Sequence, residues 1–248
     1  MAAKTVPEEE VKRLKGLGFL NNKGTDSFSA RMITGNGRVT PDTLRALADA
    51  AERYGDGHAV FTTRLTVEIP GIPYEKIELF TAAMKEHGLE PGGTGPRVRP
   101  VVCCKGSTCQ YGLIDTYDIA ERIHERFYKG YHSVILPHKF KIAVGGCPNN
   151  CVKPTLNDFG IMGWKDGCRV FLGGRWGKKF SVGQALPGIY DTGDELMDLI
   201  EKAILFYKEN GKPGERFALT IERLGFDAVS SVLEGGGLLD RKEEILRG

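Results

Sequence analysis

The chain has 248 residues and a formal net charge of +2, with 41% apolar and 27% charged residues. This composition is globular, and the length suits one large domain or two small ones. The balanced charge argues against a general nucleic-acid binder, and no apolar run reaches the roughly 18 residues that a membrane helix needs. Residues 1–10 lack the apolar core of a signal peptide, so we expect a cytoplasmic protein with no membrane or nucleic-acid partner.

The first part of the chain predicts a small α+β unit. In chain order we expect a helix, a strand, a helix, a strand and a helix at residues 7–15, 27–33, 40–54, 58–69 and 74–86. Thr40 and Pro41 are typical of a helix start, and Pro70 is expected to end the second strand.

The second part alternates strands and helices and predicts an α/β unit. We expect strands at 100–102, 139–144, 160–164 and 169–172, and helices at 113–128, 194–210 and 215–223. These patterns divide the chain into a helical N-terminal extension (1–25), an α+β half-domain (26–92) and a larger α/β domain (93–248).

The cysteines carry the most specific chemical signal. Five of the six lie in two glycine-flanked loops at strand ends: Cys103, Cys104, Cys109, Cys147 and Cys151. A chain without an export signal is not expected to form disulfides. Clustered thiols in loops favour a metal site, whereas Cys168, alone at the start of an apolar strand, is expected to be structural.

The spacing of the thiols favours an iron–sulfur cluster over zinc. Structural zinc sites usually have two residues between paired cysteines, while the wider gaps here suit a [4Fe–4S] cube. Pro148 is suited to the first position of a helix, which would place Cys147 and Cys151 on one face. The amides of Asn149 and Asn150 are then expected to donate to cluster sulfurs.

Several motifs, in order, resemble those of the sulfite and nitrite reductase family, whose members bind siroheme coupled to a [4Fe–4S] cluster. They are the two cysteine loops, Thr-Thr-Arg at 62–64, Arg99 before the first loop, the Pro-x-Lys-Phe-Lys pattern within 136–141, and Leu-Gly-Gly-Arg at 172–175. The likeness covers about residues 28–210. It implies a ferredoxin-like half-domain at 26–92, followed by a domain that binds siroheme and the cluster at 93–248.

The resemblance also implies roles for individual residues. The residues expected to hold and protonate the substrate are Arg64, Arg99, Lys139 and Lys141. The residues expected to contact the cofactors are Arg31, Thr62, Thr63, Arg97, Asn149, Gly173, Gly174 and Arg175. Alternation along a strand places Lys139 and Lys141 on one side and Phe140 on the other, which indicates an anion site or a water-filled cleft.

Two features leave alternatives open. Cys103 has the family's five-residue gap to Cys109, whereas Cys104 has the family's glycine, Gly106, two residues later; we favour Cys104 as the first ligand. For Arg31 and Arg97, surface solvation is the alternative to a carboxylate contact.

The function expected from the resemblance is the reduction of sulfite to sulfide, with nitrite as a surrogate substrate. No ferredoxin-type cysteine run is present, so electrons are expected from an external low-potential carrier such as a ferredoxin. Since larger relatives carry two copies of this unit and this chain has one, we expect a homodimer that shares its sites. The alternatives are an iron–sulfur electron-transfer or assembly protein without siroheme, and a zinc-stabilised binding module.

Overall fold

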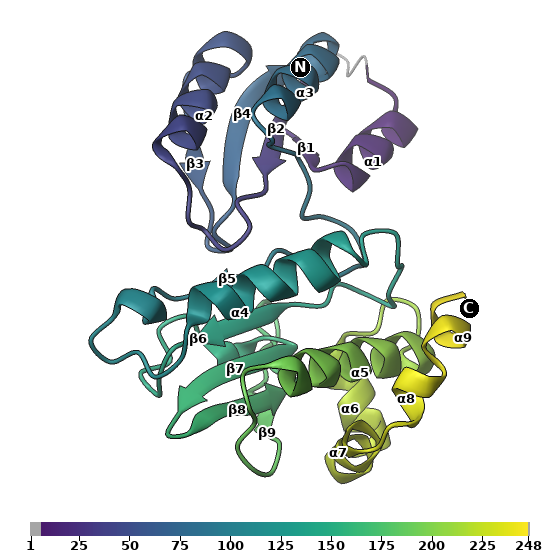
Figure 1. Ribbon diagram of the computed structural model, residues 1–248. Helices are drawn as coiled ribbons and strands as arrows, with labels where there is room; N and C mark the ends of the chain where they lie inside the picture. Colours follow the sequence, from purple (N-terminus) through teal and green to yellow (C-terminus); the bar gives the residue numbers. More distant parts are fainter. Residues whose placement is uncertain (1–5, 248) are drawn as a thin grey trace. The chain divides into compact units, whose positions relative to one another are not determined.

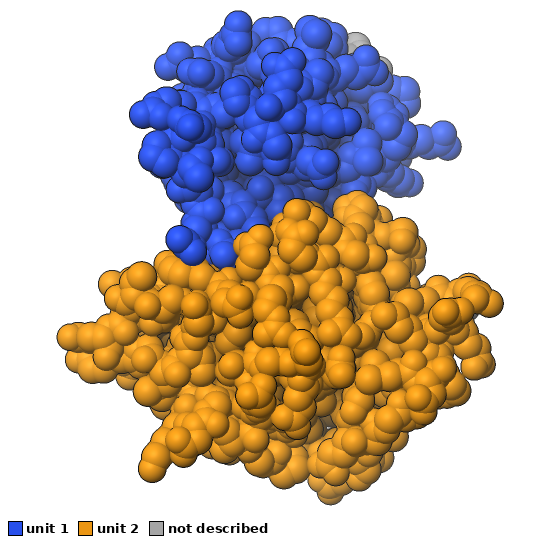
Figure 2. All heavy atoms as spheres, in the orientation of Figure 1, with its two compact units in different colours: residues 1–95 blue, residues 96–248 orange. Residues whose placement is uncertain are grey.

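A computed structural model describes residues 6–247, and the chain divides into two compact units, residues 1–95 and 96–248 (Figure 2). Residues 1–5 of the expected N-terminal extension and residue 248 of the expected second domain lie outside the described range. Within that range no helix has both the length and the apolar character needed to cross a bilayer.

The first unit is an antiparallel sheet packed against helices (Figure 1). Its strands, in spatial order, are β1 (Phe19–Asn21), β2 (Ser27–Met32), β4 (Val67–Pro73) and β3 (Val60–Phe61). Its helices are α1 (Glu8–Gly16), α2 (Pro41–Tyr54) and α3 (Ile77–Glu86), the last preceded by a 3-10 turn, η1 (Tyr74–Lys76). The fully buried side chains of Phe28, Ile69 and Phe80 form the centre of its core.

The strand expected at 58–69 is wrong, because a tight turn divides it. Thr62 N–H donates to Thr66 C=O at 2.8 Å, and the two threonine hydroxyls hydrogen-bond at 2.7 Å. Leu65 takes a left-handed conformation with φ of 59°, which a continuous strand cannot contain. The result is a hairpin between β3 and β4 that carries Thr63 and Arg64 in its turn.

Pro70 does not end a strand, as the sequence predicts, but lies inside β4 at a β-bulge. Phe28 of β2 lies opposite Ile72, and Ala30 lies opposite Ile69, so one residue of β2 faces two of β4. A bulge lets proline occur within a sheet because the ladder is locally interrupted. Gly71 completes it with φ of 80°, and a Cβ there would lie 2.7 Å from the Cβ of Asp56.

The predicted N-terminal extension is part of this first unit. Strand β1, which the sequence patterns did not predict, pairs with β2 through Phe19 opposite Ala30. Leu14 of α1 is 1% exposed and belongs to the same core. A domain boundary at residue 25 therefore does not separate two compact units.

The second unit is built on a five-stranded mixed sheet. Its strands, in spatial order, are β5 (Val102–Cys103), β6 (Ile142–Gly145), β7 (Phe159–Trp164), β8 (Gly167–Leu172) and β9 (Gln184–Ala185). Strands β5, β6 and β7 pair parallel to one another. Strand β8 pairs antiparallel with β7, and β9 pairs antiparallel with β8. The carboxyl ends of β5 and β6 therefore lie at one edge of the sheet and their amino ends at the other.

The helices of the second unit are α4 (Thr116–Ile123), α5 (Asp194–Asn210), α6 (Phe217–Leu224), α7 (Phe226–Glu234), α8 (Gly237–Asp240) and α9 (Lys242–Arg247). Three of them correspond to the predicted ones, α4 and α6 with later starts, and the sequence patterns did not predict α7, α8 or α9. The helix expected at 113–128 begins at residue 116, because the Asp115 side chain caps it by accepting from the backbone N–H groups of Tyr117 and Asp118. It continues as a π-helical segment, η3 (His124–Lys129).

Candidate functional site

The two cysteine loops leave neighbouring parallel strands at the same edge of the sheet. Cys103 pairs in register with Val144, so β5 and β6 end side by side. The backbone N–H of Gly146, just beyond β6, donates to the Sγ atom of Cys104 at 3.1 Å. Strand pairing thus brings the two cysteine loops into contact, although Cys104 and Gly146 lie 42 positions apart in the chain.

Glycines let the backbones of these loops touch. A Cβ on Gly146 would lie 2.8 Å from the Cα of Gly106 in the other loop. A Cβ on Gly163 of β7 would lie 2.3 Å from the carbonyl oxygen of Gly146. Because both distances are shorter than any Cβ contact permits, side chains at these positions would push the loops apart.

The first loop is also anchored to the start of α4. The Thr116 hydroxyl donates to the carbonyl oxygen of Cys104 at 2.7 Å, and the Ser107 hydroxyl donates to the capping carboxylate of Asp115. A short 3-10 turn, η2 (Gly106–Thr108), then leads to Cys109. The loop conformation is therefore set by hydrogen bonds in the protein itself.

Within the tandem pair, the geometry favours Cys104 as the residue that faces the second loop. Cys103 is a β-strand residue with 5% exposure. Burial raises its thiol pKa to about 12, with a smaller contribution from the neighbouring Cys104 thiol. Cys104 lies beyond the strand, is only partly buried, and contacts Gly146.

The helix expected from Cys147 to Cys151 is wrong, and a turn occupies that segment. Cys147 C=O accepts from Asn150 N–H at 3.3 Å, and Asn150 has φ of 56°, a left-handed value that asparagine tolerates but a helix does not. Asn149 is exposed, and the Asn150 amide donates to the Thr155 hydroxyl at 3.4 Å. Cys151 is the exposed thiol of the set.

The donor set suits an iron–sulfur cluster, although the thiols are not gathered into a finished coordination sphere. Among residues 6–247, no three His, Cys, Asp or Glu side chains lie close enough to hold a metal ion. Cys104, Cys109, Cys147 and Cys151 nevertheless share two adjoining loops, and thiolates are the ligands that iron–sulfur clusters take. These residues fit the group, provided that the loops adjust to bring the sulfurs together.

The predicted substrate residues of the second unit lie at the opposite edge of the sheet. Arg99 N–H donates to Phe140 C=O at 2.8 Å, and Phe140 N–H donates to Arg97 C=O at 3.1 Å. These segments precede β5 and β6, so Arg99, Lys139 and Lys141 lie at the amino ends of strands whose carboxyl ends carry the cysteines. The expected alternation is present, because Phe140 is fully buried while both lysines are partly exposed.

Lys139 is part of a cationic cluster. Burial lowers its pKa below the usual lysine value, and the charges of Arg216, Arg99 and Arg175 lower it further, while Asp158 opposes them. Cations gathered around one carboxylate make this region suited to hold an anion.

His138 belongs to the same cluster. Its Nδ1 accepts the backbone N–H of Lys139 at 2.7 Å. Burial lowers the pKa of His138, and the charge of Lys139 lowers it further, so the neutral ring is favoured.

Sequence reasoning missed the buried pair of Asp158 and Arg216. Nη2 of Arg216 donates to both carboxylate oxygens of Asp158, at 2.9 and 2.8 Å, and the two side chains are 7% and 0% exposed. Lys141 N–H also donates to Asp158, at 2.9 Å. The residues lie 58 positions apart in the chain, and no local pattern links them.

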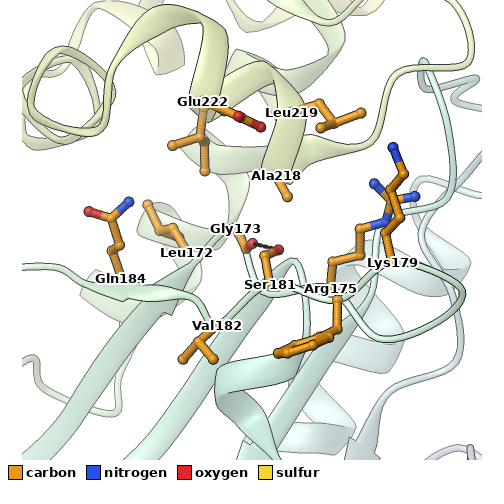
Figure 3. A pocket seen from close by; sticks show the side chains of 12 residues that line it. Leu172, Gly173, Arg175, Lys179, Ser181, Val182, Gln184, Ala218, Leu219 and Glu222 are labelled. Atoms are coloured by element: carbon orange, nitrogen blue, oxygen red, sulfur yellow. Dashed lines mark hydrogen bonds between the residues drawn. The ribbon is translucent and has the colours of Figure 1, made fainter.

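The predicted cofactor residues Gly173, Gly174 and Arg175 form a tight loop after β8. Gly173 has φ of 79°, and a Cβ on Gly174 would lie 2.4 Å from the carbonyl oxygen of Thr155. The loop borders a hollow of about 510 Å³ between the β8–β9 connection and α6 (Figure 3). Arg175 and Lys179 contribute cationic side chains to its lining.

The other predicted site residues belong to the first unit. The guanidinium of Arg31 on β2 forms a 2.7 Å ion pair with Glu68 on β4 and donates to Gly93 C=O at 3.3 Å. Thr62 and Arg64 are partly exposed, and Thr63 is exposed, in the hairpin turn. The Glu68 contact gives Arg31 a partner within its own sheet.

Two family models match nearly the whole described chain. "Nitrite and sulphite reductase 4Fe-4S domain" matches residues 94–235, and "Nitrite/Sulfite reductase ferredoxin-like half domain" matches residues 21–87. An assimilatory-type sulfite reductase of Nitratidesulfovibrio vulgaris is 29% identical over 201 residues, covering 80% of this chain and 88% of that protein. A coenzyme F420-dependent sulfite reductase of Methanocaldococcus jannaschii is 38% identical over 130 residues, covering 52% of this chain and 20% of that protein.

Nitrite reductases and solved structures are also similar. The NAD(P)H nitrite reductase of Bacillus subtilis is 28% identical over 217 residues, covering 86% of this chain and 26% of that protein. The structure of the NirA protein of Mycobacterium tuberculosis has a TM-score of 0.81 at 18% identity, covering 93% of this chain and 47% of that one, which shows a shared fold. The chain spans 20% and 48% of the length of the first two curated relatives that it matches.

The burial of the cysteines predicts their order of alkylation in the folded, metal-free protein. Burial raises the thiol pKa of Cys103 and of Cys168 to about 12. About one such thiol in ten thousand is then ionised at pH 8, so iodoacetamide should leave both unmodified. Exposed Cys151 should react first, as peptide mass spectrometry over time would show. Rapid labelling of Cys103 in folded protein at pH 8 would contradict this order, and labelling of all six in urea is the control.

Proposed function

Because this chain belongs to the nitrite and sulphite reductase family, we propose that it reduces sulfite to sulfide with siroheme and a [4Fe–4S] cluster. The observation that carries the proposal is the sheet with thiols at one edge and a cationic cluster around Lys139 at the other. A sulfite dianion requires more positive charge than nitrite, and nitrite is then a smaller surrogate. Cysteines that hold a cluster must stay reduced, so we place the protein in the cytoplasm.

Each set of residues has a separate task in this proposal. Bound siroheme and cluster would transfer to the substrate the six electrons that an external low-potential carrier such as a ferredoxin delivers. Cys104, Cys109, Cys147 and Cys151 would hold the iron, and the Gly173–Arg175 loop would contact siroheme carboxylates.

The basic side chains would bind the substrate and supply protons. Arg99 offers a permanent cation to the oxyanion, because a guanidinium does not lose its proton. Lys139 is suited to proton transfer, since its lowered pKa brings the ammonium nearer to physiological pH. Protons are needed because the oxygens of sulfite leave as water. For Arg64, in the hairpin turn of the first unit, the same task is implied by the family resemblance alone.

The proposal is tested by anaerobic purification, an ultraviolet–visible spectrum, and iron and sulfide analysis. We expect siroheme absorption together with cluster iron. Cys109→Ser, Cys147→Ser and Cys151→Ser should each lose most of the cluster iron, because an alkoxide is a poor substitute for a thiolate. Cys104→Ser should lose it as well, whereas Cys103→Ser and the control Cys168→Ser should keep it.

The alternatives give different results in the same assays. Zinc without iron would indicate a zinc-stabilised module. Iron and sulfide without a tetrapyrrole spectrum would indicate an electron-transfer or assembly protein. Full cluster occupancy in the Cys147→Ser and Cys151→Ser proteins would reject the ligand assignment.

Lys141 is expected to decide between sulfite and nitrite. In the family that this chain resembles, asparagine at the corresponding position is typical of plant-type nitrite reductases. Asparagine carries no charge. Lys141→Asn should therefore lower kcat/KM for sulfite by about tenfold or more while sparing nitrite, since one cationic contact to a dianion is lost. Steady-state rates with a reduced viologen dye measure both substrates. Higher kcat/KM for nitrite in the unaltered protein, with sulfite reduction unchanged by Lys141→Asn, would overturn the preference.

The opposite placement of the two residue sets favours a site shared between two chains. From Lys141 to Cys147 the chain passes along β6, and an extended segment of this length spans on the order of 20 Å. A lysine side chain does not reach back over such a distance. A two-fold dimer resolves this, because each subunit then offers its lysines to the iron-binding loops of the other.

The shared site predicts complementation between two inactive variants. Lys141→Ala and Cys147→Ser chains should each be inactive alone, and co-expressed hybrids should recover about half of the unaltered activity per dimer, because one site in two stays intact. Differently tagged chains and tandem affinity purification isolate the hybrid. A confirmed hybrid without activity would show that both sets act within one chain.

A further inference from the structure

The buried pair of Asp158 and Arg216 connects three parts of the second unit. Asp158 lies between a 3-10 turn, η4 (Pro154–Leu156), and β7, while Arg216 immediately precedes α6. The Nε atom of Arg216 is buried and has no hydrogen-bond partner among the described residues. The Nη2 atom of this guanidinium donates to both oxygens of the Asp158 carboxylate.

Asp158 contacts both segments that carry candidate site residues. Its Oδ2 accepts the backbone N–H of Lys141 at 2.9 Å, and its carbonyl oxygen accepts the N–H of Gly173 at 3.0 Å. The following residue, Phe159, donates its N–H to Lys141 C=O at 3.0 Å. One short stretch of chain therefore holds Lys141 from both sides and also fixes the start of the Gly173–Arg175 loop.

Arg216 is held in place by the packing of α6. The next residue, Phe217, is fully buried, with its ring centroid 5.3 Å from those of Phe140 and Tyr207. Phe140 lies between the two candidate lysines in the chain. The start of α6 thus supports the lysine segment through an aromatic contact and through the Arg216–Asp158 ion pair.

Stability alone is a weak reason to keep such a pair. Two charges removed from water are costly, and apolar side chains of the same size often stabilise a fold as well or better. This pair differs from a purely structural one because the same carboxylate also binds the backbone at Lys141.

We propose that Asp158 and Arg216 are positioning residues, which hold the Lys139–Lys141 segment and the Gly173–Arg175 loop in fixed relation to each other and so set the affinity for the oxyanion. The claim about affinity rests on the proposed function, and the claim about the two segments does not. Asp158 and Arg216 act through their neighbours rather than by contact with substrate.

The experiment compares four variants of the anaerobically purified holoprotein. They are Asp158→Asn, Arg216→Met, Arg216→Lys and, as a matched control, Glu201→Gln. Glu201 is also a buried carboxylate, 2% exposed, and it pairs with Arg126 and Lys242. Deuterium uptake of peptides that contain residues 139–141 and 173–175 is measured, together with melting temperature and the KM and kcat for sulfite.

The expected result is local. Asp158→Asn and Arg216→Met should speed exchange in both segments by about tenfold or more, since a buried charge loses its partner. The KM for sulfite should rise about as much, with kcat changed far less. Arg216→Lys should recover part of both effects because it restores a cation. Glu201→Gln should lower the melting temperature without affecting either segment or the KM.

Unchanged exchange in both segments, or a change no larger than in Glu201→Gln, would overturn the positioning role. If Asp158→Asn does not fold, the comparison of Arg216→Met with Arg216→Lys decides by the same measurements. If the unaltered holoprotein does not reduce sulfite, the proposed function fails. The deuterium exchange of residues 139–141 and 173–175 then decides by itself whether Asp158 and Arg216 hold the two segments.

Discussion

Parallel pairing of β5 with β6 is the constraint on which the candidate site depends. It brings the loops that follow the two strands to one edge, so Cys104 lies against Gly146. It also brings the segments that precede them to the other edge, where Arg99 is hydrogen-bonded to Phe140. One pairing therefore places the candidate iron ligands at one edge of the sheet and the candidate substrate residues at the other.

Backbone contacts position the chain at both edges of the sheet. At the cysteine edge, Gly106, Gly146 and Gly163 allow approaches that any side chain would block. At the basic edge, Asp158 accepts the backbone N–H of Lys141 and so holds the backbone of the lysine segment. In both places contacts of the backbone determine where the side chains of the candidate site residues lie.

The sequence patterns identified most of the regular structure because that signal is local. Helix α5 was predicted with its observed bounds, and α2 begins after the Thr40 cap as expected. The strand predicted at 58–69 and the helix predicted at 147–151 were wrong. In both, a single residue takes a left-handed conformation, Leu65 and Asn150, and residue type alone did not indicate it.

By itself the sequence determined the chemistry: which thiols are grouped, which basic residues accompany them, and which family they resemble. These inferences depend on residue type and spacing, and they require no tertiary structure. Tertiary structure decided that Cys103 is buried in a strand, that Arg31 pairs with Glu68, and that Asp158 meets Arg216. Such contacts join residues far apart in the chain, and only the packing of the folded sheets and helices selects them.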